Sequence, residues 1–366
     1  NPGILYEVEE TAAFVAEKLE SFGCDEVVTG IGRTGVVGII HGKNAKNGKT
    51  IGLRADMDAL PIHEESGKPW SSKNDGKMHA CGHDGHTAML LGAAQHLAET
   101  RNFEGSIAVI FQPAEEGGAG GKAMVDDGMM TRFSIDEVYG MHNLPGLEVG
   151  EFAIKSGAIM AATDEFKITI TGVGGHAALP HNTIDPIVVG SSMVQSLQSV
   201  ASRNADPMES LVLSVTQFHA GDAYNVIPET AVIVGTIRTL SKELRHLGEQ
   251  NMRRIAISTA EAYGAKVDIS FRSGYPVTYN HDAQTDFAAQ VASSVVGSDK
   301  VDINLPAMMG GEDFSYMLEE KPGAFIFVGN GDTAGLHHPK YDFNDDAIPF
   351  GTSYWVALAE SALPTS

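Results

Sequence analysis

The sequence predicts an α/β protein of two domains: a larger, discontinuous domain with a mainly parallel sheet, and an inserted ferredoxin-like domain of order βαββαβ. Its 366 residues exceed the roughly 250–300 at which a single hydrophobic core stops growing. Strand and helix patterns alternate towards both ends of the chain, which is typical of a parallel sheet. The pattern changes near Thr163. We therefore expect residues 1–162 and 273–366 to form the larger domain and residues 163–272 the insertion.

The larger domain begins with a helix that is followed by short apolar strands. Apolar residues recur at helical spacing from Val8 to Phe22, and Gly23 is expected to end that helix. Two apolar runs, a second helix and two further strands follow, at residues 36–40, 51–55, 87–99, 106–111 and 138–142. This alternation indicates an α/β domain with a largely parallel sheet.

The inserted domain begins with a strand that has one exposed face. The run EFKITITGV, which starts at Glu165, alternates between apolar and polar residues. A helix from Asp185 to about Ser202 comes next, and two strands, a helix and a last strand follow it, at residues 211–220, 230–238, 242–263 and 266–271. This order matches a ferredoxin-like split unit.

Charge and cysteine content exclude several classes of partner and location. The formal charge of −22 argues against nucleic acid and against anionic membranes, because phosphates require a basic surface. No segment approaches the roughly 18 uninterrupted apolar residues of a membrane span, and the first residues show no secretory signal pattern. The two cysteines, Cys24 and Cys81, make a disulfide framework implausible. We therefore expect a cytoplasmic protein.

Possible metal ligands are concentrated at the ends of the predicted strands of the larger domain. Asp56 and Asp58 in LRADMDALP share one face of a strand, since side chains alternate along it. The other donors lie in MHACGHDGH (Cys81 and His83), FQPAEEGG (Glu115 and Glu116), MHNLP (His142) and GLHHP (His337 and His338). In a parallel sheet the loops after the strands meet in one crevice. These residue types at these positions predict a metal centre.

Other kinds of site fit these segments less well. Cys81 could be a nucleophile paired with a histidine, but a thiolate among several imidazoles and carboxylates is more readily explained as a ligand. The run GGAGG after Glu116 lacks the Gly-Lys-Ser/Thr ending of a phosphate loop. No Gly-x-Ser-x-Gly elbow supports a serine hydrolase.

Five strong donors predict two ions rather than one. They are Cys81, His83, Glu116, His142 and His337. One tetrahedral ion needs three or four protein ligands, so five suggest two ions that share a bridge. Two such ions lower the pKa of a water between them. Glu115 would then take the proton from that water and pass it to a leaving group.

The motifs of this chain resemble, in order, those of the M20 metallopeptidase family. They are MHACGHDGH, FQPAEEGG, MHNLP, GVGGHAALP, NVIP, GTIRT, GGEDF and LHHP, and the resemblance runs nearly end to end. They are similar to those of its amidohydrolase branch, which contains hippurate hydrolases, N-acyl-amino-acid hydrolases and plant auxin-conjugate hydrolases. The resemblance implies a catalytic domain with a two-metal centre, and an inserted lid or dimerisation domain.

The resemblance also implies a role for each polar residue of the larger domain. Cys81, His83, Glu116, His142 and His337 match the family's metal-ligand positions, Glu115 matches the general base, and Asp58 matches a carboxylate that orients a ligand. Asp56 stands where other branches carry a ligating histidine, so the resemblance does not make it a ligand.

Three residues of the inserted domain are candidates for substrate contacts. His176 follows a glycine-rich turn, which lets the backbone bring an imidazole close to a ligand. Asn225 and Arg238 are polar groups of the kind that hold a carboxylate. The resemblance implies that all three contact the substrate, and that His176 acts catalytically by polarising the scissile carbonyl.

The resemblance implies a metal-dependent amidohydrolase that cleaves an N-acyl amino acid into a carboxylic acid and a free amino acid. A dipeptidase of the same family is an alternative, and so is a catalytically silent protein that binds a carboxylate at its metal centre. We expect two divalent ions per subunit; the thiolate favours zinc or cobalt, and the resemblance allows manganese. The resemblance also suggests a homodimer, in which His176 acts either within its own chain or at the neighbouring subunit's metal centre.

Overall fold

The computed structural model describes residues 1–45 and 48–365, which divide into two compact units. The first unit comprises Asn1–Ile159, Thr278–Pro306 and Asp313–Ser366, and the second comprises Met160–Val277 and Ala307–Glu312. The short segment 307–312 lies in a part of the sequence that the pattern assigns to the larger domain. A hydrogen bond from the Ala161 N–H to the Gly310 carbonyl joins it to the second unit, and local periodicity cannot indicate such a contact.

The first unit is built on an eight-stranded sheet of order β1-β2-β4-β3-β5-β16-β6-β15. Its four central strands are parallel: β4 (Ser106–Gln112), β3 (Thr50–Asp56), β5 (Glu137–Leu144) and β16 (Gly323–Gly329). The outer strands are β1 (Glu26–Ile31), β2 (Gly35–His41), β6 (Phe152–Ala153) and β15 (Val301–Asp302). The predicted α/β class with a mainly parallel sheet is confirmed. The sequence did not predict β1, whose residues are mostly exposed or half-buried.

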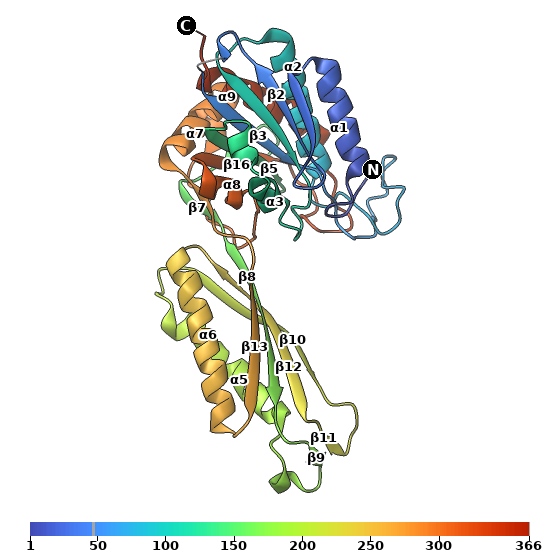
Figure 1. Cartoon of the computed structure of the whole chain (residues 1–366), viewed down its shortest axis with the longest axis vertical. Helices are drawn as coiled ribbons and strands as arrows, with labels where there is room; N and C mark the ends of the chain where they lie inside the picture. Colours follow the sequence, from blue (N-terminus) through green and yellow to red (C-terminus); the bar gives the residue numbers. More distant parts are fainter. Residues whose placement is uncertain (46–47, 366) are drawn as a thin grey trace. The chain divides into compact units, whose positions relative to one another are not determined.

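Helices cover both faces of this sheet (Figure 1). One face carries α1 (Glu9–Phe22), α2 (His83–Thr100), α9 (Ile348–Ala362) and α7 (Asp282–Val296), packed side by side in that order. The other face carries α3 (Gly120–Asp126) and α8 (Ser315–Glu320), with α4 (Met129–Arg132) beside α3. The central strands are therefore buried on both faces, as a parallel sheet requires.

Helix α2 begins at His83, four residues before the start that the sequence predicts at Thr87. Gly82 precedes it with a φ of 84°, and a Cβ at this position would lie 2.4 Å from the Tyr341 hydroxyl oxygen. Only glycine fits this turn. The polar residues of the first helical turn interrupt the apolar periodicity from which helix starts are recognised. His83 is therefore fixed on a helix rather than in a loop.

The second unit has a four-stranded antiparallel sheet of order β10-β12-β8-β13 with two helices packed against it. Its elements are β8 (Ala162–Thr171), α5 (Pro186–Leu197), β10 (Leu211–Ala220), β12 (Thr230–Thr239), α6 (Lys242–Ala262) and β13 (Lys266–Ser273). This arrangement is that of a ferredoxin-like unit. Helix α5 ends before the predicted Ser202, and a π-helical turn at Val200–Asn204 follows it. Two short strands, β9 (Gly175–His176) and β11 (Val226–Ile227), form a separate ribbon.

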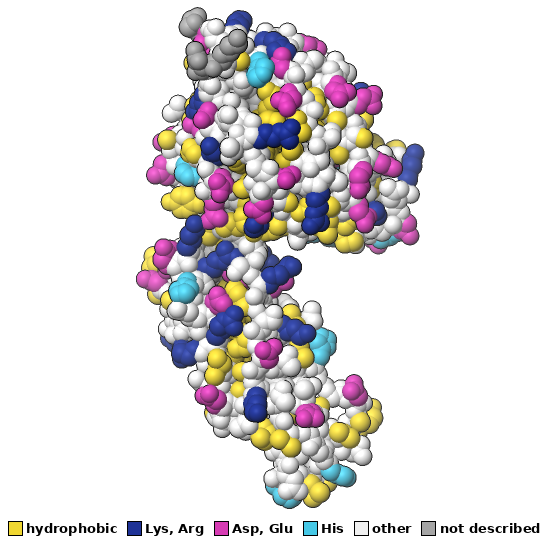
Figure 2. Space-filling view, viewed as in Figure 1, with side chains coloured by type: hydrophobic (Ala, Val, Ile, Leu, Met, Phe, Trp, Pro, Cys, Tyr) yellow, Lys and Arg dark blue, Asp and Glu magenta, His cyan; other side chains and the backbone are white. Residues whose placement is uncertain are grey.

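The visible surfaces of the two units differ in charge. Acidic side chains predominate over the first unit, whereas acidic and basic side chains are interspersed over the second (Figure 2). The net charge of −22 is therefore not evenly expressed on the visible surface. Among the described residues, no helix combines the length and apolar character needed to span a membrane.

Candidate metal centre

The carboxyl ends of β3, β4, β5 and β16 lie at one edge of the sheet, because these strands are parallel. Asp56 ends β3, the two glutamates follow β4, His142 lies near the end of β5, and the loop after β16 leads to His337. Cys81 and His83 come from the turn into α2. The topology therefore brings together donors that lie far apart in the sequence.

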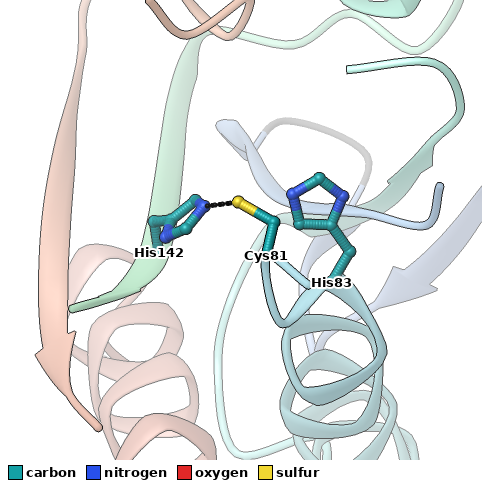
Figure 3. Close-up of side chains that lie close together, drawn as sticks. All are labelled: Cys81, His83 and His142. Atoms are coloured by element: carbon teal, nitrogen blue, oxygen red, sulfur yellow. Dashed lines mark hydrogen bonds between the residues drawn. The ribbon is translucent and has the colours of Figure 1, made fainter. Parts of the chain in front are cut away.

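Cys81 is a donor that two of the possible ligand clusters share. Its Sγ lies 3.3 Å from Nε2 of His142, and Figure 3 shows it between the rings of His142 and His83. The donor atoms of Cys81, His83 and His142 lie within 4.8 Å of one another, and so do those of Cys81, Glu116 and His337. In the second cluster, Oε1 of Glu116 is 3.2 Å from Nε2 of His337. The sequence-predicted ligands thus form two three-donor groups joined at one sulfur.

Several buried atoms of this cluster lack a protein partner in hydrogen-bonding geometry. They are Nδ1 and Nε2 of His83, and Oε1 of Glu116. His83 is fully buried, although Asp58 Oδ1 lies 3.3 Å from its Nδ1. Buried polar atoms are almost always hydrogen-bonded. Unsatisfied atoms on a buried imidazole and a buried carboxylate are therefore available to bind a metal ion. The residues present therefore fit divalent ions.

The protonation of His142 and Cys81 also fits cations at this site. The Nδ1–H of His142 donates to the Asn143 carbonyl at 2.7 Å, which leaves the Nε2 lone pair facing the sulfur. Burial holds the pKa of His142 well below its usual value, so the ring is neutral. Burial raises the pKa of the Cys81 thiol. A thiolate at this position therefore needs a nearby positive charge, which a metal ion supplies.

The other donors shift one another's pKa. Burial alone would raise the pKa of Glu116, but the nearby His337 and His83 imidazoles hold it below its usual value. The nearby Cys81 sulfur and Glu116 carboxylate raise the pKa of His337 to about 10. Burial disfavours a charged His83, yet the Asp56 carboxylate and Cys81 outweigh it and raise its pKa. Negative donors therefore attract positive charge into this crevice.

Asp58 holds the turn that carries the glutamate pair. Its two carboxylate oxygens accept the backbone N–H groups of Glu115 at 3.0 Å and of Glu116 at 3.1 Å. The turn is tight, because Ala114 has a φ of 54° and Gly117 a φ of 91°. Asp58 Oδ1 also lies against Nδ1 of His83. One carboxylate thus contacts both a candidate ligand and the backbone beneath the two glutamates.

Asp56 lies beside the cluster, but other groups bind its carboxylate. Its Oδ2 accepts a hydrogen bond from Nη1–H of Arg54 at 2.8 Å, and its Oδ1 accepts one from Nδ1–H of His86 at 2.6 Å. Arg54 is fully buried and also bonds Gln112 and Asp313. The sequence did not single out His86, although its position three residues after His83 on one helix face was a signal that could have found it.

The three candidates of the second unit lie at two places. The ladder of β9 and β11 pairs His176 with Val226, and the Ala177 N–H donates to the Asn225 carbonyl at 3.0 Å, so His176 and Asn225 are neighbours. Arg238 lies eight positions beyond Thr230 along β12, or about 27 Å at the usual rise per residue. Its guanidinium lies near Gly311. Among the described residues, no acid pairs with it.

Residues 52–361 match the family described as peptidase family M20/M25/M40. The chain is 43% identical to hippurate hydrolase of Campylobacter jejuni over 359 residues, which cover 98% of this chain and 93% of that protein. The chain belongs to peptidase family M20/M25/M40. The predicted family is thus confirmed.

Two further relatives show how closely the chain follows this family. N-acetyl-L-cysteine deacetylase of Bacillus subtilis is 42% identical over 363 residues, which cover 99% of this chain and 84% of the deacetylase. A crystal structure of a dinuclear metal-binding M20 peptidase from the same organism superposes with a TM-score of 0.86 at 33% identity, covering 100% of this chain and 95% of that one. The family fold therefore extends over both units.

Proposed function

We propose that this protein is a metal-dependent amidohydrolase that cleaves N-acyl amino acids into a carboxylic acid and a free amino acid. The observation that carries the proposal is the pair of three-donor groups joined at Cys81, with a second buried carboxylate, Glu115, on the same turn as the donor Glu116. Hippurate hydrolase and N-acetyl-L-cysteine deacetylase, to which the chain is similar, act by their names on acylated amino acids.

Two divalent ions are proposed to occupy the two donor groups. Cys81, His83 and His142 would hold one, and Cys81, Glu116 and His337 the other, so that the thiolate belongs to both donor groups. Ions bound there would polarise a carbonyl group and lower the pKa of a bound water. The thiolate and the imidazoles favour zinc or cobalt, which softer ligands select, over manganese.

The chain's own residues are proposed to move the protons. Glu115 takes a proton from the attacking water and delivers it to the leaving nitrogen. Asp58 contributes by fixing the turn through the N–H groups of Glu115 and Glu116. Nδ1 of His176 accepts the Ala178 N–H at 3.1 Å, so in the neutral ring Nε2 carries the proton. That N–H is the donor that would stabilise the developing oxyanion of the scissile carbonyl.

The proposed homodimer would complete the site from two chains. His176 and Arg238 lie near opposite ends of the sheet in the second unit, too far apart for one small N-acyl amino acid to touch both within a chain. Strand β10 lies at the edge of this sheet and exposes Val212 and Phe218. An exposed edge strand with apolar side chains is suited to pairing with its twin across a two-fold axis.

A cytoplasmic location is also proposed. Neither Cys24 nor Cys81 forms a disulfide. A thiolate ligand must stay reduced to bind its metal, and a reducing compartment favours that state.

Assays of amine release from a panel of N-acyl amino acids test the proposed function. We expect hydrolysis of N-benzoyl or N-acetyl amino acids, its complete loss after treatment with a chelator, and its return on adding zinc, cobalt or manganese. Hydrolysis of dipeptides with no action on N-acyl amino acids would identify a dipeptidase instead. A metal-loaded protein that binds these substrates without releasing amine would be the catalytically silent carboxylate-binding alternative.

The Arg238→Ala protein is expected to bind α-carboxylate substrates more weakly. A guanidinium pairs with a carboxylate in the ground state and the transition state alike, so KM should rise while kcat changes little. Amides without that carboxylate should be hydrolysed at nearly the wild-type rate. Steady-state kinetics on matched substrates with and without the carboxylate measure this difference. Equal losses on both kinds would remove Arg238 from carboxylate recognition.

Mixed dimers of two inactive chains are expected to recover activity if His176 acts on the neighbouring subunit. When Glu115→Gln and His176→Ala chains are co-expressed, each mixed dimer has one site with both defects and one site with none. Random pairing makes about half of the dimers mixed, so roughly a quarter of wild-type activity should return. Verified mixed dimers that stay as inactive as either parent would show that His176 acts within its own chain.

A further inference from the structure

Asn143 is a fully buried residue that follows His142 on β5. Its side chain bonds to two other segments of the metal centre. Nδ2 donates to the Cys81 carbonyl at 2.7 Å, and Oδ1 accepts the Tyr341 hydroxyl at 2.9 Å. Tyr341 belongs to the loop that carries His337, and the His337 N–H donates to the Ala80 carbonyl at 2.7 Å. One amide therefore ties together the segments of three donors.

The backbone of Asn143 fixes two imidazoles. Its carbonyl accepts Nδ1–H of His142, so the lone pair of that ring is on Nε2, the atom that faces Cys81. Its N–H donates to Nε2 of His86 at 2.9 Å. Because a backbone N–H can only donate, His86 must carry its proton on Nδ1, where it meets Asp56. The Asp56 carboxylate is held in turn by Arg54.

We propose that Asn143 is the positioning residue that sets the separation of the Cys81, His142 and His337 donors. This proposal rests on the two-metal centre proposed above. Among the described hydrogen bonds, the side chain of Asn143 is the one that joins β5 to both the Cys81 turn and the His337 loop. Without the amide, β5 would lose its side-chain bonds to the Cys81 turn and to the loop that carries His337, and the backbone bond between His337 and Ala80 would remain. Groups that orient metal ligands in this way tune metal affinity strongly.

A matched control separates this role from an ordinary contribution to stability. Asn280 is equally buried in the same unit, and its side chain also makes strong bonds, to the Lys155 carbonyl and to both backbone groups of Phe325. None of these partners carries a metal donor. Asn143→Ala and Asn280→Ala should therefore lose comparable thermal stability, and only the first should alter metal binding.

The test is a cobalt titration of the whole chain, in which binding is measured by calorimetry and by the thiolate-to-cobalt absorption. We expect Asn143→Ala to bind cobalt roughly 10–100-fold more weakly than wild type, the range for outer partners of a ligand, with a changed absorption spectrum. Asn280→Ala should keep the cobalt affinity and the absorption spectrum of the wild type. Tyr341→Phe removes one hydroxyl only, so it should fold and show a smaller loss in the same direction.

Two negative results distinguish a failure of the proposed metal centre from a failure of the proposed role of Asn143. Wild-type protein that binds fewer than two cobalt ions per subunit would overturn the proposed metal centre, and the role of Asn143 with it. Wild-type protein that binds two ions, with Asn143→Ala and Tyr341→Phe unchanged in affinity and spectrum, would overturn the role of Asn143 alone.

Discussion

The Glu115→Gln protein is expected to keep both metal ions and to lose at least about 100-fold in kcat, the lower end for general acid–base catalysis. The amide has nearly the shape of the carboxylate but cannot accept a proton near neutral pH. Glu115 is only 8% exposed, and its carboxylate oxygen lies within 4.8 Å of donor atoms of His83 and Glu116. It is therefore close enough to exchange a proton with a water held in the centre.

Metal content and kcat must be measured on the same preparation of this variant. The bond that places Glu115 runs from its backbone N–H to Asp58, so the substitution should leave the turn intact. Glu137→Gln is a matched control: Glu137 lies at the opposite end of β5, where it bonds Lys49 and Tyr139, and kcat should not change. If Glu115→Gln loses its metals, Glu115 is itself a ligand, and the proposed division between the two glutamates is wrong.

The α/β class and the order of elements could be predicted because they depend on local periodicity. The helix from Glu9 to Phe22 and the buried strand Ser106–Gln112 are each encoded within one short run. The features that were not predicted lack such a run. Strand β1 is largely solvent-accessible, and α2 starts among polar residues that interrupt the apolar periodicity. Neither feature has the apolar pattern from which strands and helix starts are recognised.

The candidate ligands could be predicted because donor types at strand ends are themselves a signal. The groups that support them could not. Asp56 is bonded to Arg54, two residues away, but its other partner, His86, lies 30 residues further along the chain. Asn143 meets Tyr341 across 198 residues. Pairings of this kind depend on how α2, β5 and the loop after β16 pack, and no spacing within the sequence encodes them.

The Cys81→Ala protein is expected to lose at least one metal ion per subunit, with a fall in metal affinity of at least about 100-fold, the upper end for the loss of an outer partner. The sulfur belongs to both three-donor groups, so each ion would retain only two of its proposed ligands. The remaining imidazoles and carboxylate could still bind one ion weakly. Activity should fall with metal content, because both ions are proposed to lower the pKa of the attacking water.

Cys24→Ala is the matched control for this change, since it removes the only other thiol. Cys24 is half-buried against the core of the first unit, and burial together with Asp25 raises its pKa to about 11. It is therefore a neutral thiol at physiological pH, and its loss should leave metal content and activity unchanged. Elemental analysis of both variants, with the thiolate-to-cobalt absorption as a second measurement, distinguishes the two cysteines. A Cys81→Ala protein that still holds two ions per subunit would show that the sulfur is not a ligand that both ions need.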